Sequence, residues 1–154
     1  MRNEMALAAV AILLSASCFA LTDNRWQADA SGNWSGKWSD TAHWSQGRTP
    51  NGSTDDTAIF DNQAVPYTVE IDGDYTVPGF FKIGEGKARP GTGMVTFTGT
   101  GSVRQSQSTF YVYTDREFCV EGNVSIGESN SMEAMSGSKT YVAGNGAILL
   151  SGQI

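Results

Sequence analysis

The four Trp residues of the chain lie within one stretch, from Trp26 to Trp44. An indole ring has a flat apolar face that stacks well on a sugar ring, which makes Trp34, Trp38 and Trp44 candidate glycan-binding residues. The alternative role is structural, because a Trp buries a large apolar area and covers the open end of a small core well. We expect the structural role, with these rings forming a cap over the first part of the fold.

Three acidic residues that follow the Trp stretch are candidate metal ligands. Asp55, Asp56 and Asp61 supply carboxylate oxygens, the ligands that calcium prefers. The chain has no EF-hand loop and no Gly-Gly-x-Gly-x-Asp repeat. We therefore expect a solvated turn whose carboxylates accept backbone hydrogen bonds, with no required cofactor and calcium as the alternative.

His43 is the single His of the chain and limits the acid–base chemistry that can be expected. Any Ser-His-Asp or Cys-His arrangement would have to use it, yet it lies between Ala42 and Trp44 in the Trp-rich stretch. Neither a Gly-x-Ser-x-Gly nucleophile motif nor a His-Glu-x-x-His metal motif is present. We expect no catalytic residues and a protein that is not an enzyme.

The rest of the sequence predicts an all-β fold. It has 18 Gly in 154 residues, and no long segment shows the apolar period of a helix. Short apolar or alternating runs between Gly- and Asn-rich turns indicate many strands. The predicted strands are residues 57–60, 67–71, 75–77, 80–83, 94–98, 110–113, 118–120, 124–126, 140–142 and 147–150.

Three sequence blocks recur in the same order. Residues 82–85 (KIGE) resemble 125–128 (SIGE) at an offset of 43, and 95–103 resemble 140–148 at an offset of 45. An earlier block, 69–74 (VEIDGD), resembles 118–123 (FCVEGN). Such periods are typical of stacked repeats, so we expect a β-solenoid with about two coils per unit. A β-sandwich with similar hairpins is the alternative.

The N-terminal residues suggest that the protein is exported, and the C-terminal residues suggest that its repeats are truncated. Residues 1–20 read as a signal peptide, with Arg2 before an apolar core and a cleavage site near Ala20. A lipoprotein signal that uses Cys18 is an alternative. We expect three segments: signal peptide 1–20, Trp-rich N-terminal cap 21–62 and solenoid repeats 63–154. The last repeat stops in an apolar strand, which predicts that the coils are truncated at the C-terminus.

The net charge of the chain reduces the classes of binding partner that can be expected. A formal net charge of −6 disfavours nucleic acid, because phosphate binding needs a basic surface. The apolar leader is too short to span a membrane, and the mature segment contains no other candidate span. The partners left open are extracellular glycans and surface proteins.

Two segments carry a resemblance to a known family. Residues 32–44 (GNWSGKWSDTAHW) and 50–61 (PNGSTDDTAIFD) resemble the N-terminal region of large secreted bacterial proteins with autotransporter-associated β-strand repeats. Relatives of that family carry sorting tails of the PEP-CTERM type. Its usual opening has a Trp, a Gly-rich spacer, Asn-Trp, a Pro-x-Gly-Asp-Asp turn and a Val-x-Phe strand, followed by Ile-Gly coils.

The resemblance is loose and covers about residues 26–150. His43 replaces the usual Asn before Trp44, and Ser53 and Thr54 are inserted before the Asp pair. What the resemblance implies is a right-handed parallel β-helix and exposure at the cell surface, not a reaction.

We therefore expect an exported protein, secreted or associated with the outer membrane at the cell surface, that serves as a structural and adhesive β-solenoid. One alternative is a carbohydrate-binding module that uses the Trp cluster. Another is the non-catalytic part of a carbohydrate-active enzyme.

Overall fold

The computed structural model of the chain describes residues 20–52, 55–85, 91–107, 109–129 and 131–150. The predicted signal peptide lies outside these residues except for Ala20. The described residues form strands, turns and one short 3-10 helix, η1 (Thr41–His43). Among the described residues, no helix is long and apolar enough to cross a membrane.

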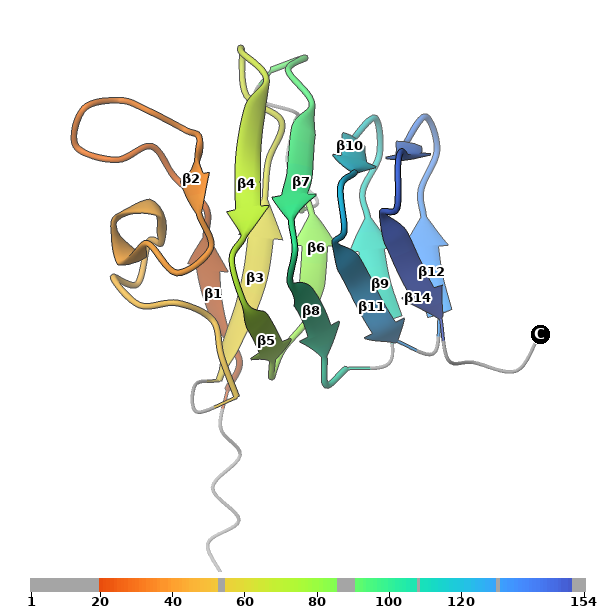
Figure 1. Ribbon diagram of the computed structural model, residues 1–154, viewed down its shortest axis with the longest axis horizontal. Helices are drawn as coiled ribbons and strands as arrows, with labels where there is room; N and C mark the ends of the chain where they lie inside the picture. The colour runs from red at the N-terminus through yellow and green to blue at the C-terminus, as the bar shows by residue number, and fades with distance from the viewer. Residues whose placement is uncertain (1–19, 53–54, 86–90, 108, 130, 151–154) are drawn as a thin grey trace, which may run out of the picture.

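The strands assemble into three sheets that run along the same axis (Figure 1). The rear sheet contains β1 (Thr22–Arg25), β3 (Asp56–Phe60), β6 (Phe81–Ile83), β9 (Thr109–Val112) and β12 (Ser131–Ala134). The upper sheet contains β2 (Gly36–Lys37), β4 (Tyr67–Ile71), β7 (Val95–Gly99), β10 (Glu117–Val120) and β13 (Lys139–Val142). The lower sheet contains β5 (Asp74–Val77), β8 (Ser102–Gln105), β11 (Ser125–Ser129) and β14 (Ala147–Leu150).

From β3 onward the chain visits the rear, upper and lower sheets in turn, so three consecutive strands make one coil; the turn before it contributes only β1 and β2. Every pairing between these strands is parallel. Residues in matching positions are 28 apart at Asp74 and Ser102 and 22 apart at Glu117 and Lys139. Parallel strands in one sheet need a connection that returns to the start of the sheet, and here the other two sheets supply it.

The register confirms one of the predicted repeats and corrects two. Val95 pairs with Phe118, which pairs with Thr140, so the 95–103 and 140–148 blocks lie two coils apart as expected. The match between 82–85 and 125–128 is wrong, because β6 belongs to the rear sheet and β11 to the lower sheet.

The third match falls in the right sheet but two residues out of register. Val69 pairs with Phe97, which pairs with Val120, whereas the sequence match aligned Val69 with Phe118. Inward and outward side chains alternate along a strand, so a shift of two residues preserves the pattern and sequence similarity alone does not detect it.

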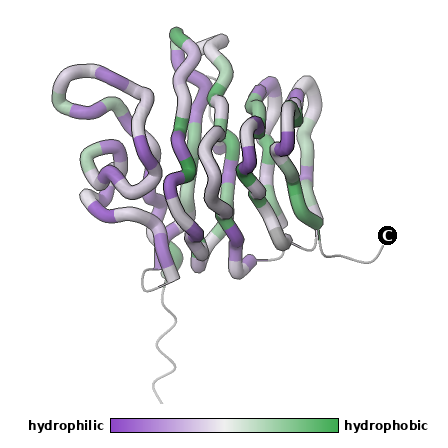
Figure 2. The backbone as a smooth tube through the Cα atoms, in the orientation of Figure 1, coloured by the Kyte–Doolittle hydropathy of each residue, from purple (hydrophilic) through white to green (hydrophobic). Residues whose placement is uncertain are grey.

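Alternation along the strands separates core from surface. In β4, Tyr67, Val69 and Ile71 are buried while Glu70 is exposed. Figure 2 shows the same change between hydrophobic and hydrophilic residues along single strands. The inward side chains of successive coils stack into one hydrophobic core that runs from the Trp-rich region to β11.

The fold is therefore all-β, with three parallel sheets in a β-helix-like arrangement. A Greek-key sandwich does not fit, because its strands pair antiparallel. Large apolar side chains stay exposed at Leu21 and Val65 and, in the last two described strands, at Tyr141, Val142, Leu149 and Leu150.

Candidate functional site

The Trp-rich stretch folds onto itself. The side chains of Trp26, Trp38 and Trp44 are buried, and Trp34 is half-buried. The Trp44 indole N–H donates to the Trp38 carbonyl at 2.8 Å, and the Trp26 indole N–H donates to the Trp34 carbonyl at 2.7 Å. These bonds satisfy two indole donors that burial would otherwise leave unpaired.

The Trp rings continue directly into the core of the coils. Trp38 lies 5.7 Å from Phe60 and 6.2 Å from Phe81 between ring centroids, and Trp44 lies 5.5 Å from Phe60. We call the stack of inward rings the aromatic column; its members are Trp38, Trp44, Phe60, Phe81, Phe97, Phe110 and Phe118. The Trp rings form its first layer.

The burial of the Trp rings limits which of the three predicted glycan-binding residues could contact a ligand. Trp38 is 0% exposed and Trp44 is 1% exposed, so neither offers a ring face to a ligand in this structure. Trp34 keeps part of its surface exposed and packs at 5.8 Å from Tyr67. The structure therefore does not bring the three rings together as one exposed platform.

His43 is a packing residue in the same region. Its ring stacks on Trp26 at 4.7 Å with an interplanar angle of 7°, and its Nδ1 lies 2.9 Å from the Gln27 carbonyl oxygen. A Cβ on Gly36 would overlap the imidazole ring, so the Gly lets the backbone lie against it. The ring is buried and held by these contacts.

Asp61 lies apart from the other two predicted calcium ligands, Asp55 and Asp56. Asp56 is buried and accepts hydrogen bonds from Arg48 at 2.6 and 3.0 Å and from Asn24 at 3.0 Å. Asp61 follows the other end of β3, roughly 16 Å away by strand rise. Asp55 precedes the strand and is exposed. Within the described ranges, no group of three or more His, Cys, Asp or Glu residues is placed to hold a metal.

Asp61 belongs instead to an ion cluster at the edge of the rear sheet. Its Oδ1 lies 3.1 Å from the Arg116 guanidinium and its Oδ2 lies 3.7 Å from that of Arg25. Arg25 also pairs with Glu85 and with Asp23. Burial raises the pKa of the Asp61 carboxyl, and the two Arg charges oppose part of that rise.

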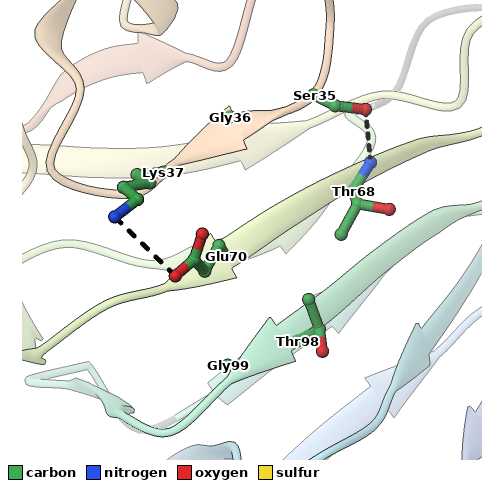
Figure 3. Close-up of a pocket in the computed structure, with 7 residues that line it drawn as sticks. All are labelled: Ser35, Gly36, Lys37, Thr68, Glu70, Thr98 and Gly99. Atoms are coloured by element: carbon green, nitrogen blue, oxygen red, sulfur yellow. Dashed lines mark hydrogen bonds and ion pairs between the residues drawn. The ribbon is translucent and has the colours of Figure 1, made fainter.

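The surface carries one hollow that sequence reasoning missed. It has a volume of about 460 Å³ and opens over the upper sheet where β2, β4 and β7 lie side by side (Figure 3). Its lining residues are Ser35, Gly36, Lys37, Thr68, Glu70, Thr98 and Gly99.

Two polar contacts connect residues that line this hollow. The Thr68 backbone N–H donates to the Ser35 hydroxyl oxygen at 3.0 Å, and Lys37 Nζ lies 3.9 Å from Glu70 Oε1 (Figure 3). Both charged side chains are largely exposed, so the pair is weak. The arrangement can hydrogen-bond a polar ligand in this open hollow. The alternation in β4 and β7 predicts which side chains face out, but only the pairing of β2 with β4 brings Lys37 to them.

Comparison with known proteins identifies no relative. No family model matches the chain, and no curated protein or solved structure matches it.

Proposed function

We propose that the chain is an exported structural and adhesive β-solenoid, placed at the cell surface or in the extracellular medium. The observation that carries the proposal is the unbroken stacking of coils around the aromatic column. Each sheet continues its parallel ladder from coil to coil, and the inward rings pack in the same direction. In this proposal the coils form a right-handed β-helix.

Such a stack presents its outer side chains on a stiff, repeating lattice. Neighbouring strands lie about 4.8 Å apart, so an outward position recurs at that spacing from coil to coil. Solenoids use their extended surfaces for binding, and they need a cap on the first coil. The buried Trp38 and Trp44 suit that capping role, which leaves the outer sheet faces for adhesion.

The sequence features at the N-terminus support export. Residues 1–20 have the pattern of a signal peptide. Residues 32–44 and 50–61 resemble secreted bacterial proteins with autotransporter-associated repeats, and kinship with those proteins is part of the proposal.

A deletion of the gene in the source cells tests the proposal. We expect the deletion to reduce attachment of the cells to surfaces or to each other, and the full chain to restore it. A variant that lacks residues 2–20 is the matched control, because it keeps every coil but loses the leader. Equal restoration by both chains, or unchanged attachment of the deletion strain, would contradict the proposal.

A further inference from the structure

The outer face of the rear sheet carries aromatic side chains that the core does not use. Phe80, Tyr111 and Tyr113 are half-buried. The ring centroids of Phe80 and Tyr111 lie 5.4 Å apart, and those of Tyr111 and Tyr113 lie 6.1 Å apart. We call these three residues the aromatic strip. Their neighbours Phe81, Phe110 and Val112 are fully buried and point inward, so alternation directs the strip outward.

Strand register places charged residues in line with the strip. Lys82 pairs with Tyr111, and Tyr111 pairs with Glu133 on the next coil. Towards the N-terminus, Lys82 pairs with Ile59, which pairs with Arg25. The Lys82 ammonium lies 5.1 Å from the centroid of the Phe80 ring, within the range of a cation–π contact.

Carboxylates border the strip as well. Asp23 and Glu85 each form an ion pair with the guanidinium of Arg25, at the end of β1. Burial raises the pKa of the Tyr113 phenol, and the charges of Tyr111, Glu133, Glu85 and Asp23 raise it further. The rings and hydroxyls of the aromatic strip therefore lie on the same face of the rear sheet as the charged residues Lys82 and Glu133.

We propose that the aromatic strip is a binding face for a neutral polysaccharide. Tyr and Phe rings stack on the C–H faces of sugars, and the phenol hydroxyls with the bordering charges offer hydrogen bonds to sugar hydroxyls. The strip spans two consecutive coils, which suits an extended chain rather than a single sugar. The mixed local charge and the net charge of −6 favour a neutral chain over an anionic one. The inference rests on the proposed function, for which it supplies the ligand class of adhesion.

Titration of the purified chain with neutral hexasaccharides tests the assignment. The probes are cellohexaose, maltohexaose and the hexamer of N-acetylglucosamine, with oligogalacturonate as the anionic comparison. We expect at least one neutral probe to bind by calorimetry and Tyr111→Ala to weaken that binding by about tenfold or more. Tyr111→Phe should keep most of it, because the ring remains.

Tyr141→Ala is the matched control, because Tyr141 is an exposed Tyr on the outer face of the upper sheet, 44% exposed and paired in register with Cys119. It should leave binding unchanged. Retained Trp fluorescence establishes that each variant keeps its core. No binding of any neutral probe, tighter binding of oligogalacturonate, or an equal loss in Tyr141→Ala would overturn the inference.

A measurement on the unaltered chain avoids any effect of substitution on folding. Tetranitromethane nitrates accessible Tyr rings, and peptide mass analysis locates the products. The bound hexasaccharide should protect Tyr111 and Tyr113 and leave Tyr141 reactive; protection of Tyr141 alone would overturn the inference. If the chain binds a probe but stays inside the cell, the proposed function is contradicted and this inference is not. If the chain is exported but binds no probe, this inference is contradicted and the proposed function is not.

Discussion

The side chain of Asn62 and the backbone of Glu117 hydrogen-bond to each other in both directions. Asn62 Nδ2 donates to the Glu117 carbonyl at 2.6 Å, and the Glu117 N–H donates to Asn62 Oδ1 at 3.0 Å. The same amide donates to the Gly93 carbonyl at 2.9 Å, and Asn62 is 0% exposed. One buried amide thus ties the turn after β3 to the segments that begin β7 and β10.

Replacing Asn62 with Ala should destabilise the fold by about 1–3 kcal/mol, because the Glu117 N–H loses its buried partner. Urea denaturation followed by circular dichroism measures the change. Asn145→Ala is the control, since the exposed Asn145 amide donates to the side-chain oxygen of Asn123, also exposed, at 2.9 Å. That change should stay within about 0.5 kcal/mol. Equal effects of the two substitutions would contradict this role of Asn62.

Trp38→Ala should cost about 3–5 kcal/mol of stability, because it empties the first layer of the aromatic column. Trp34→Ala should cost clearly less, since that ring is only half-buried. Thermal denaturation compares the two variants. Iodide should quench only a minor part of the Trp fluorescence of the folded chain. Complete quenching would show that Trp38 and Trp44 face solvent.

Gly101→Ala should destabilise the fold strongly, by about 1–3 kcal/mol or more, because its Cβ would overlap the Gly73 backbone of the neighbouring coil. Gly52→Ala is a close control, with its nearest contact at an ordinary 4.0 Å from Thr76. Chemical denaturation should place the Gly52 variant close to the original chain. A stable Gly101 variant would mean that the coils stack less closely than described.

Stability should fall at alkaline pH through Tyr75. Burial and a 2.9 Å hydrogen bond to Asp72 raise the pKa of the Tyr75 phenol from 10.0 to about 12. Between these values the folded chain keeps a proton that the unfolded chain has lost, so stability falls as pH rises through that window. Tyr75→Phe should remove this part of the pH dependence. Its ultraviolet titration should lose one late tyrosinate transition and keep those of Tyr67 and Tyr113, whose phenol pKa values burial also raises. An unchanged titration would contradict the assignment.

The sequence predicts strands whose apolar residues alternate with polar ones or form a continuous run, but not the polar strands. Residues 67–71 and 147–150 form β4 and β14 with the expected bounds. β12, with the sequence SMEA, has no strand signal of its own and gains its conformation by pairing with β9. Pairing of this kind depends on coils far apart in the chain, so a local pattern does not reveal it.

The surface sites were harder to predict for the same reason. The residue type made the Trp residues candidates for glycan binding, yet Trp38 and Trp44 lie in the core. Tyr111 and Lys82 look unremarkable in the sequence and become neighbours only through the register of β6 and β9. Which outward residues meet is decided by coil length, which differs along the chain: paired positions are 28 residues apart at Asp74 and Ser102 but 22 apart at Glu117 and Lys139.

The most direct test of the proposed function is the N-terminal sequence and location of the natural product. Cells of the source are separated into medium, surface and interior, and the chain is recovered from each for intact mass and N-terminal analysis. An exported β-solenoid predicts a chain that begins near Leu21 in the medium or surface fraction. A chain confined to the interior that still begins at Met1 would contradict it.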